Sequence, residues 1–333
     1  MDRADLVLEG GGVKGLGLVG AVVRLMREGY SFQRVAGTSA GAIVAALLAA
    51  GATYEQLIAA MGRLDYRRVP DPPRPGIPVL SEGISLMVKG GAFKGDYIDG
   101  FVRDELQRLG VRTFRDLRRT DQGADRQEGS ERKYKLVVMA TDVTRGRLLR
   151  LPWDYEELLG RPADDQLVAD AVRASIAIPL FFEPVTVSNE KTGVETTLVD
   201  GGILSNFPIE IFDRTDGEVP RWPTLGVKVM PALPIGDPEL FPGLPLPTPR
   251  PLHLVEQVLA TAIVGHDQTY LERPCVRRRA IQVDTRAVGI VEFDADEKKR
   301  EAVVASGDEA ARRFLAGWSW ERFKAECRGV KDQ

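Results

Sequence analysis

The stretch VAGTSAGAIVAALLAAG (residues 35–51) places one serine between a run typical of a β-strand and a run typical of an apolar helix. Gly37, Ser39 and Gly41 form the pattern G-x-S-x-G at this junction, which is the sequence context of a nucleophile elbow. Small neighbours let the serine hydroxyl project alone toward a substrate carbonyl, and the N–H of Ala40 points into the same space. A serine here also commonly caps the following helix. The pentapeptide alone favours neither interpretation.

The segments around this stretch alternate between strand and helix patterns. Residues 5–9 (DLVLE) and 32–37 (FQRVAG) have the character of buried strands, and residues 15–29 carry apolar positions at helical spacing. The run after Ser39 is apolar on every side, as expected of a helix enclosed by other elements. Strands that alternate with helices predict a largely parallel sheet covered on both faces, so the expected fold class is α/β.

A glycine-rich segment, EGGGVKGLG (residues 9–17), joins the first of these strands to its helix. Gly10, Gly12 and Gly15 fit the dinucleotide-binding pattern G-x-G-x-x-G, but that function also requires an acidic residue where the second strand ends in VAGTS. A P-loop requires serine or threonine after its lysine, whereas Lys14 is followed by glycine. The unhindered N–H groups can still bind an anion, such as the oxyanion formed when an ester carbonyl is attacked.

A third segment, LVDGGILSNFP (residues 198–208), ends a predicted strand at Asp200. An Asp-Gly pair is common in simple strand-ending turns, but a catalytic serine needs a base within reach. The order Ser39, Asp200, His266 matches an α/β-hydrolase triad, although in that fold the elbow follows several strands and here it follows the second. We therefore favour Asp200 acting directly as the base. Asp142 also ends a predicted strand, but no glycines follow it, and we expect it to be a hydrogen-bonded structural residue.

Together, these segments resemble the patatin-like phospholipases. The resemblance rests on GGGVKG (10–15), GTSAG (37–41) and DGG (200–202), which occur in the family's order and with similar spacing. RASIAIPLFFEPV (173–185) is similar to the family's approach to its catalytic aspartate. The resemblance covers about residues 5–230 and implies a three-layer α/β/α fold with a mostly parallel central sheet. It also implies a lipid acyl hydrolase (phospholipase A, lysophospholipase or esterase) that forms a covalent acyl-enzyme and needs no cofactor or metal.

The resemblance implies a role for each motif residue. Ser39 is the implied nucleophile and Asp200 the implied proton acceptor. The oxyanion hole is expected from the backbone N–H groups of Gly10, Gly11, Gly12 and Ala40. The supporting motif positions are Lys14, Gly15, Gly37, Gly41, Gly201 and Gly202. Lys14 and Glu9 stand where many relatives have arginine and aspartate, and a lysine cannot make the bidentate contacts that arginine makes with a phosphate.

The chain is expected to divide into three parts. We predict a catalytic domain at residues 1–230, a proline-rich connector or flap at 231–251, and a helical and strand extension at 252–333 packed on the same domain. The extension is expected to begin with an amphipathic helix at 252–270. The apolar and proline content of residues 239–259 makes this region a candidate for peripheral contact with a membrane or micelle.

Composition restricts the remaining functional classes. The 333 residues include 45 basic and 48 acidic side chains, a near balance that argues against a nucleic-acid-binding protein. Cys275 and Cys327 lack the spacing of a zinc or redox site, so we expect free thiols. The N-terminus lacks the pattern of a secretory signal, and no uncharged apolar run is long enough to span a membrane. A cytoplasmic protein that acts on an acyl lipid or ester is therefore the expectation.

Overall fold

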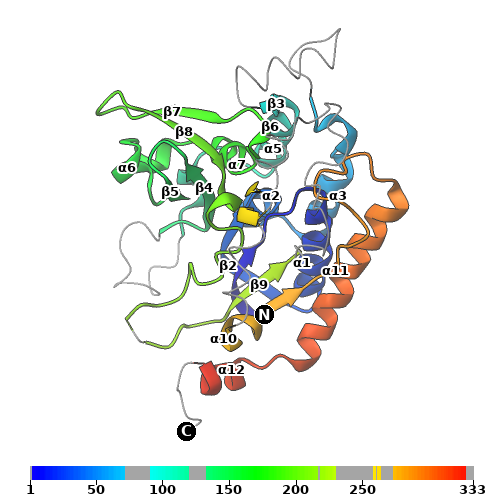
Figure 1. The fold of residues 1–333 in the computed structure, drawn as a ribbon. Coiled ribbons are helices and arrows are strands. Elements are labelled where there is room, and N and C mark those ends of the chain that lie inside the picture. The colour runs from blue at the N-terminus through cyan, green and yellow to red at the C-terminus, as the bar shows by residue number, and fades with distance from the viewer. Residues whose placement is uncertain are drawn as a thin grey trace.

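The computed structural model describes residues 2–71, 91–119, 133–216, 218–229, 258–259, 261–263 and 273–327. Its main sheet contains β1 (Asp2–Leu8), β2 (Tyr30–Thr38), β4 (Leu136–Asp142), β5 (Arg147–Leu151), β7 (Val185–Ser188), β8 (Glu195–Asp200), β9 (Thr224–Lys228) and β10 (Ala280–Gln282). The strand order is β10-β9-β1-β2-β4-β8-β7, and β5 pairs with β4 off this path (Figure 1). A separate parallel pair joins β3 (Gly91–Phe93) and β6 (Leu180–Phe182).

The centre of the main sheet is parallel. β1 pairs in parallel with β2 and β9, β9 pairs with β10, and β2 pairs with β4. The antiparallel part lies beyond β2, where β5 and β8 both pair with β4 and β7 pairs with β8. The prediction of an α/β fold with a mostly parallel central sheet is confirmed, and the antiparallel edge is an addition that the sequence patterns did not reveal.

Helices surround this sheet. They are α1 (Leu16–Arg27), α2 (Ala40–Ala49), α3 (Tyr54–Arg63), α5 (Asp96–Arg108), α6 (Tyr155–Leu158), α7 (Val168–Ser175), α10 (Pro274–Arg277), α11 (Glu297–Gly317) and α12 (Trp320–Cys327). Short 3₁₀ turns are η1 (Gly12–Gly15), η2 (Tyr66–Arg68), η3 (Phe114–Leu117), η5 (Ala163–Asp165) and η6 (Gly201–Ile203). Helix α2 is buried along nearly its whole length, as its uniformly apolar sequence predicts.

The two faces of the sheet are covered differently. Side chains alternate across a strand, so Leu6 and Leu8 of β1 join the larger core cluster with α1, α2 and α7, whereas Val7 faces the other side. There it meets a smaller cluster that contains Phe207, Phe212 and residues of α10 and β10. An irregular segment that includes Phe207 and Phe212, together with the short helix α10, therefore packs on this second face.

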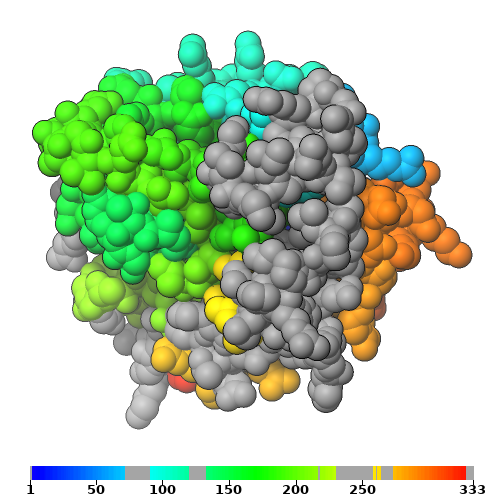
Figure 2. All heavy atoms as spheres, turned by 45° about the horizontal axis from the view of Figure 1, so that its top comes forward, coloured from blue at the N-terminus to red at the C-terminus, as the bar shows by residue number. Residues whose placement is uncertain are grey.

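The C-terminal part of the described chain joins the same sheet and core. β9 and β10 extend the sheet beyond β1, and α11 lies along α1 (Figure 1). Glycines allow the two helix backbones to touch: a Cβ at Gly20 of α1 would overlap the carbonyl of Val304, and one at Gly307 of α11 would overlap that of Gly17. In the space-filling view, the C-terminal residues in orange and the β7–β8 region in green lie on opposite sides of the molecule (Figure 2).

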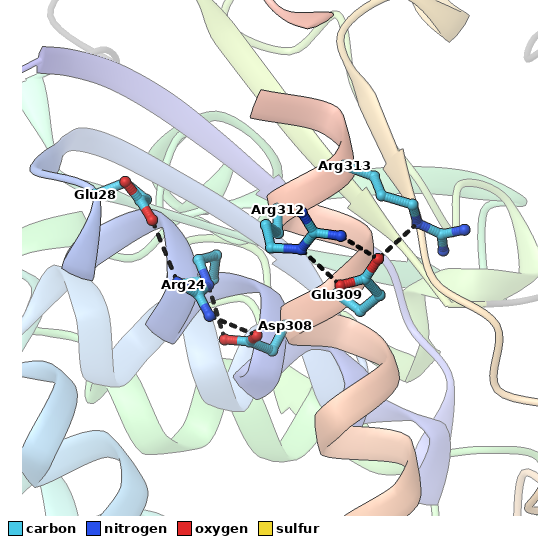
Figure 3. Close-up of polar contacts among 6 residues, drawn as sticks. All are labelled: Arg24, Glu28, Asp308, Glu309, Arg312 and Arg313. Carbon is cyan, nitrogen blue, oxygen red and sulfur yellow. Dashed lines mark hydrogen bonds and ion pairs between the residues drawn. The ribbon is translucent and has the colours of Figure 1, made fainter. Parts of the chain in front are cut away.

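Charged side chains flank the contact between α1 and α11 (Figure 3). The Nε and Nη2 atoms of Arg24 donate to the two carboxylate oxygens of Asp308 at 2.9 and 2.7 Å, and Arg24 also contacts Glu28 at 3.2 Å. On α11 itself, Glu309 pairs with Arg312 at 2.7 Å and with Arg313 at 3.6 Å. Because these groups are partly or fully exposed, we attribute the stability of the contact mainly to its close backbone packing.

The expectation of free thiols is wrong. Cys275 of α10 and Cys327 of α12 form a disulfide, with their Cα atoms 5.6 Å apart. The chain folds back after α11 and brings α12 beside α10 (Figure 1). The two cysteines are separated by 52 positions, so their spacing gave no sign of this encounter.

Two predicted segments cannot be compared with the structure. The connector at 231–251 lies outside the described residues, as does most of the helix predicted at 252–270, of which residues 258–259 and 261–263 are helical. Within the described part of the chain, every helix is too short or too polar to cross a membrane.

The backbone contact between α1 and α11 can be tested with one added methyl group. We expect Gly307→Ala to lower the free energy of unfolding by about 1–3 kcal/mol, because the new Cβ overlaps the carbonyl of Gly17. Gly62→Ala in α3 is the matched control, since its Cβ would meet nothing within 4 Å and alanine favours a helix. Urea unfolding measures both, and equal midpoints for the two variants would contradict the close contact.

Candidate active site

Ser39 occupies a sharp turn between β2 and α2. Its backbone has φ 52° and ψ −124°, a conformation that L-residues rarely adopt and that costs on the order of 1–3 kcal/mol. Its side chain makes no capping hydrogen bond to the helix, so the alternative of a simple helix cap is not what the structure contains. A Cβ at Gly37 would overlap the carbonyl of Gly41, and a Cβ at Gly41 would overlap that of Leu8. The elbow therefore needs both glycines.

The strand register brings Asp200 next to this turn. Thr38, the last residue of β2, lies opposite Met139 of β4, and Asp200 lies opposite Ala140, the next residue of the same strand. A Cβ at Gly201 would lie only 2.5 Å from the carbonyl oxygen of Met139, so the chain can turn here only without a side chain. Ser39 and Asp200, far apart in sequence, are thus neighbours because β2 and β8 pair with consecutive residues of β4.

The Asp200 carboxylate is buried and only half satisfied. It is 2% exposed, and its Oδ1 accepts the N–H of Gly202 at 2.8 Å. Its Oδ2 has no hydrogen-bond partner among the described residues. Burial raises the pKa of Asp200 to about 7, although the nearby Ser39 hydroxyl and the Gly202 N–H lower it. The hydroxyl is therefore close enough to affect the carboxyl, although the two groups do not form a hydrogen bond of ordinary geometry.

The glycine-rich turn lies beside the elbow. A Cβ at Gly15 would lie 2.8 Å from the Cβ of Ala40. Within the described chain, no hydrogen bond engages the N–H groups of Gly11, Gly12 or Ala40. Of these residues, Gly12 and Ala40 line the same pocket as Ser39.

Gly10 has a different role from the one predicted for it. Its N–H donates to the carbonyl of Asn206 at 3.2 Å, and its carbonyl accepts the side-chain amide of Asn206, also at 3.2 Å. The N–H is therefore occupied and is not a free oxyanion donor. A side chain at Gly10 would overlap Asn206 and approach the Cβ of Ser39, so the glycine is required for packing.

The C-terminal part of the chain supports the same turn. The N–H of Val13 donates to the carbonyl of Ile290 at 2.8 Å. Gly12 has φ +55°, and a Cβ there would overlap the same carbonyl. The sequence gave no signal for this contact, because any residue can supply a backbone carbonyl.

Lys14 and Glu9 are buried on either side of the glycine-rich turn. The Lys14 ammonium donates to the carbonyl of Thr285 at 3.3 Å, and burial lowers its pKa while three carboxylates raise it, those of Asp284, Glu9 and Glu292. Glu9 is fully buried, accepts the N–H of Val229 at 2.5 Å and pairs with Lys228. Both charges are therefore held inside the protein by specific partners.

An apolar pocket opens beside the Ser39 turn. Few polar atoms line this pocket. Its walls include residues of α2, α3, η2, the end of α7 and the C-terminal segment. The lining side chains beyond the two motifs are Leu16, Ile43, Val44, Met61, Leu64, Tyr66, Val69, Ile98, Ile176, Ile178, Phe182 and Phe293. A lining of this composition suits an apolar group of a ligand.

The other candidate residues do not join this site within the described structure. Asp142 is fully buried and accepts both the backbone N–H and the guanidinium of Arg145 at 3.0 Å, which agrees with the structural role expected for it. His253 and His266 lie outside the described residues, so the triad alternative has no geometry to compare. No three potential metal-ligating side chains converge anywhere in the described ranges.

Comparison with known proteins places this site in a family. A model of the patatin-like phospholipases matches residues 6–213, which include the glycine-rich turn, the elbow and the Asp-Gly-Gly segment. The chain belongs to the patatin-like phospholipase family. Family membership accounts for all three segments together, which neither the dinucleotide-binding nor the α/β-hydrolase hypothesis does.

The chain is also similar to individual proteins. The chain is 39% identical over 228 residues to YqhO of Bacillus subtilis (strain 168), which covers 68% of this chain and 71% of that protein. It is 27% identical over 326 residues to an NTE family protein of Mycobacterium tuberculosis, and this match covers 93% of this chain and 46% of that relative. The chain thus spans less than half the length of this second relative. VipD from Legionella pneumophila shares the fold, with a TM-score of 0.53 and 19% identity over 95% of this chain and 67% of that one.

Two residues of this patatin-like site were missed by motif reasoning. Asn206 joins the glycine-rich turn to the segment after Asp200, and the Ser175 hydroxyl accepts the N–H of Ser39 at 2.9 Å. Both lie in segments that were quoted for the resemblance, LVDGGILSNFP and RASIAIPLFFEPV. Their place in these quoted segments was the available signal.

The raised pKa of Asp200 predicts a pH-dependent stability. The folded-state pKa of about 7 exceeds the ordinary value of 3.8, so the folded protein holds this proton more tightly and loses stability as pH rises from about 4 to about 7. Asp200→Asn removes the buried charge, and we expect it to raise the free energy of unfolding by roughly 2–4 kcal/mol at pH 8, since one pKa unit is about 1.4 kcal/mol.

Urea unfolding of parent and variant at pH 5 and pH 8 measures this effect. The increase in the free energy of unfolding caused by Asp200→Asn should be clearly smaller at pH 5, where the parent carboxyl is protonated. Asp142→Asn is the control, because it weakens the contact with Arg145 and should destabilise the protein at both pH values. An equal gain at the two pH values, or no gain at all, would contradict the buried-charge explanation.

Proposed function

We propose that this protein hydrolyses carboxylic esters of acyl lipids through a Ser39–Asp200 dyad and a covalent acyl-enzyme. The observation that carries the proposal is the pairing of an uncapped serine hydroxyl in a strained turn with a buried carboxylate whose Oδ2 has no partner. A serine hydroxyl is a weak nucleophile until a neighbouring base removes its proton. A carboxylate with a pKa of about 7 is well matched to that task near neutral pH.

Acylation follows from this arrangement. Asp200 Oδ2 takes the proton of Ser39 as Oγ bonds to the ester carbonyl carbon, and the carbonyl oxygen becomes an oxyanion. The free N–H groups of Gly11, Gly12 and Ala40 are the proposed donors to that oxyanion. The tetrahedral intermediate then collapses, the bond to the leaving alkoxide breaks, and Asp200 returns the proton to the departing oxygen.

Deacylation uses the same groups in reverse order. Asp200 takes a proton from a water molecule, whose oxygen attacks the acyl carbon on Ser39. The second oxyanion occupies the same N–H groups, and its collapse releases the fatty acid while Ser39 regains a proton from Asp200. Each cycle consumes one ester and one water and leaves the dyad unchanged.

The apolar pocket supports a fatty-acyl substrate. Its lining beside Ser39 is made almost entirely of aliphatic and aromatic side chains, such as Ile43, Met61 and Phe182. Burial of each methylene in such a pocket contributes about 0.8 kcal/mol, so an acyl chain binds more tightly as it lengthens until the pocket is filled.

Covalent labelling tests the nucleophile and the base. We expect a fluorophosphonate probe to label Ser39, and Ser39→Ala and Asp200→Asn each to lower turnover of a p-nitrophenyl ester by at least about 1000-fold. Asp142→Asn, the same substitution at another buried strand-end aspartate, should retain turnover because Asp142 contacts Arg145 instead. Peptide mapping that places the probe elsewhere, or substantial activity in either dyad variant, would overturn the proposal.

The pH profile tests the state of the base. Asp200 must be deprotonated to accept the serine proton, so kcat/KM should rise with pH and level off above a midpoint of about 7. Stopped-flow or plate assays on a p-nitrophenyl ester from pH 5 to 9 give this midpoint, with substrate hydrolysis in buffer subtracted. A profile that is flat from pH 5 upward would exclude a base with this pKa.

A further inference from the structure

The end of helix α7 contacts the nucleophile directly through its backbone. Ser175, the last residue of α7, is fully buried, and its Oγ accepts the N–H of Ser39 at 2.9 Å. Among the described residues this is the hydrogen bond that engages the Ser39 N–H. The Ser39 N–H is therefore used for holding the turn and is not a donor to the substrate.

The same short segment also holds the other member of the dyad. The N–H of Asp200 donates to the carbonyl of Ala177 at 2.9 Å. Ser175 and Ala177 are two positions apart in the chain, so the backbones of Ser39 and Asp200 are attached to one rigid stretch. This stretch is a second link between Ser39 and Asp200. The first is β4, which pairs with both β2 and β8.

The segment reaches the apolar pocket as well. The side chains of Ile176 and Ile178, which alternate with the two hydrogen-bonding residues, line the pocket beside Ser39. Helix α7 packs against α2, which follows Ser39, and against β8, which ends at Asp200. It also packs against β4, the strand that pairs with both β2 and β8. One continuous piece of chain, residues 175–178, therefore contacts the backbones of both dyad residues and forms part of the pocket wall.

The backbone of Ser39 needs such an attachment. A non-glycine residue with positive φ is strained and persists only where its surroundings hold it in place. A buried N–H that loses its acceptor costs free energy, and a turn that can relax to recover a partner will do so. Relaxation of φ at Ser39 would swing its hydroxyl away from Asp200 Oδ2.

We propose that Ser175 is a positioning residue, whose hydroxyl holds the Ser39 turn so that the nucleophile faces its base. This inference rests on the proposed Ser39–Asp200 dyad. Ser175 is not assigned a catalytic role, because its Oγ bonds to the Ser39 backbone and, among the described residues, Asp200 Oδ2 has no hydrogen-bond partner. Its removal weakens the alignment of the nucleophile and leaves the walls of the acyl pocket in place.

Steady-state kinetics of Ser175→Ala on a p-nitrophenyl ester test the proposal. We expect kcat to fall about 10- to 100-fold, the range that corresponds to loss of one buried hydrogen bond, while KM stays within about twofold. The rate constant for fluorophosphonate labelling of Ser39 should fall by a similar factor. Urea unfolding, run alongside, establishes that the variant is folded under assay conditions.

Thr196→Val is the matched control. Thr196 is also fully buried on β8, and its hydroxyl accepts from the Arg145 guanidinium at 2.6 Å, so this variant loses a comparable buried hydrogen bond. A purely structural loss lowers the unfolding midpoint and leaves kcat of the folded enzyme unchanged, which is the result expected for Thr196→Val. The proposal requires that Ser175→Ala lower kcat much more than Thr196→Val does.

The outcomes separate this inference from the proposed function. If Ser39→Ala is inactive and folded Ser175→Ala keeps kcat within about twofold of the parent, the positioning role is wrong and the dyad stands. If Ser39→Ala is active, the dyad itself is wrong. Should Ser175→Ala fail to fold, Ser175→Cys replaces it, because its sulfur has a similar shape and is only a weak acceptor. The same loss of kcat then supports the proposal, and parent-like kcat overturns it.

Discussion

The pairing of β4 with two different strands at consecutive residues is the constraint on which the site depends. β2 runs parallel to β4 as far as Met139, and β8 pairs antiparallel with β4 from Ala140 onward. The elbow therefore leaves the sheet where β8 arrives, and Ser39 meets the end of the strand that carries Asp200. Backbone this crowded tolerates only glycine at positions such as 37, 41 and 201. The glycines at these three positions are thus consequences of the way the strands and the elbow meet.

Burial of Asp200 lowers stability in a way that serves the chemistry. A carboxylate that is 2% exposed and has one unpartnered oxygen is an unfavourable feature of the folded state above its pKa. The rest of the fold offsets this cost through a large apolar core and the close contact of α1 with α11. Because α1 follows the glycine-rich turn directly, the same contact also keeps that turn in place.

Sequence patterns predicted the local features of this structure well. Glycines at tight turns and an apolar helix after a strand are local signals, so the turn at Ser39, the strand end at Asp200 and the parallel half of the sheet could be predicted. Features that depend on backbone groups far away in the sequence could not be predicted in this way. The backbone carbonyls of Ile290 and Asn206 accept the N–H groups of Val13 and Gly10. Every residue type has such a carbonyl, so the sequence does not indicate these contacts. The occupied N–H of Gly10 and the disulfide of Cys275 belong to this second group.

The central claim is that a buried carboxylate, poised near neutral pH, faces the serine hydroxyl. Isotope-edited infrared titration of the Asp200 carboxyl, assigned by difference from Asp200→Asn, measures its ionisation directly in the folded protein. We expect a midpoint of about 7, and a midpoint near the ordinary aspartate value of 3.8 would contradict a buried carboxyl that acts as a base near neutral pH.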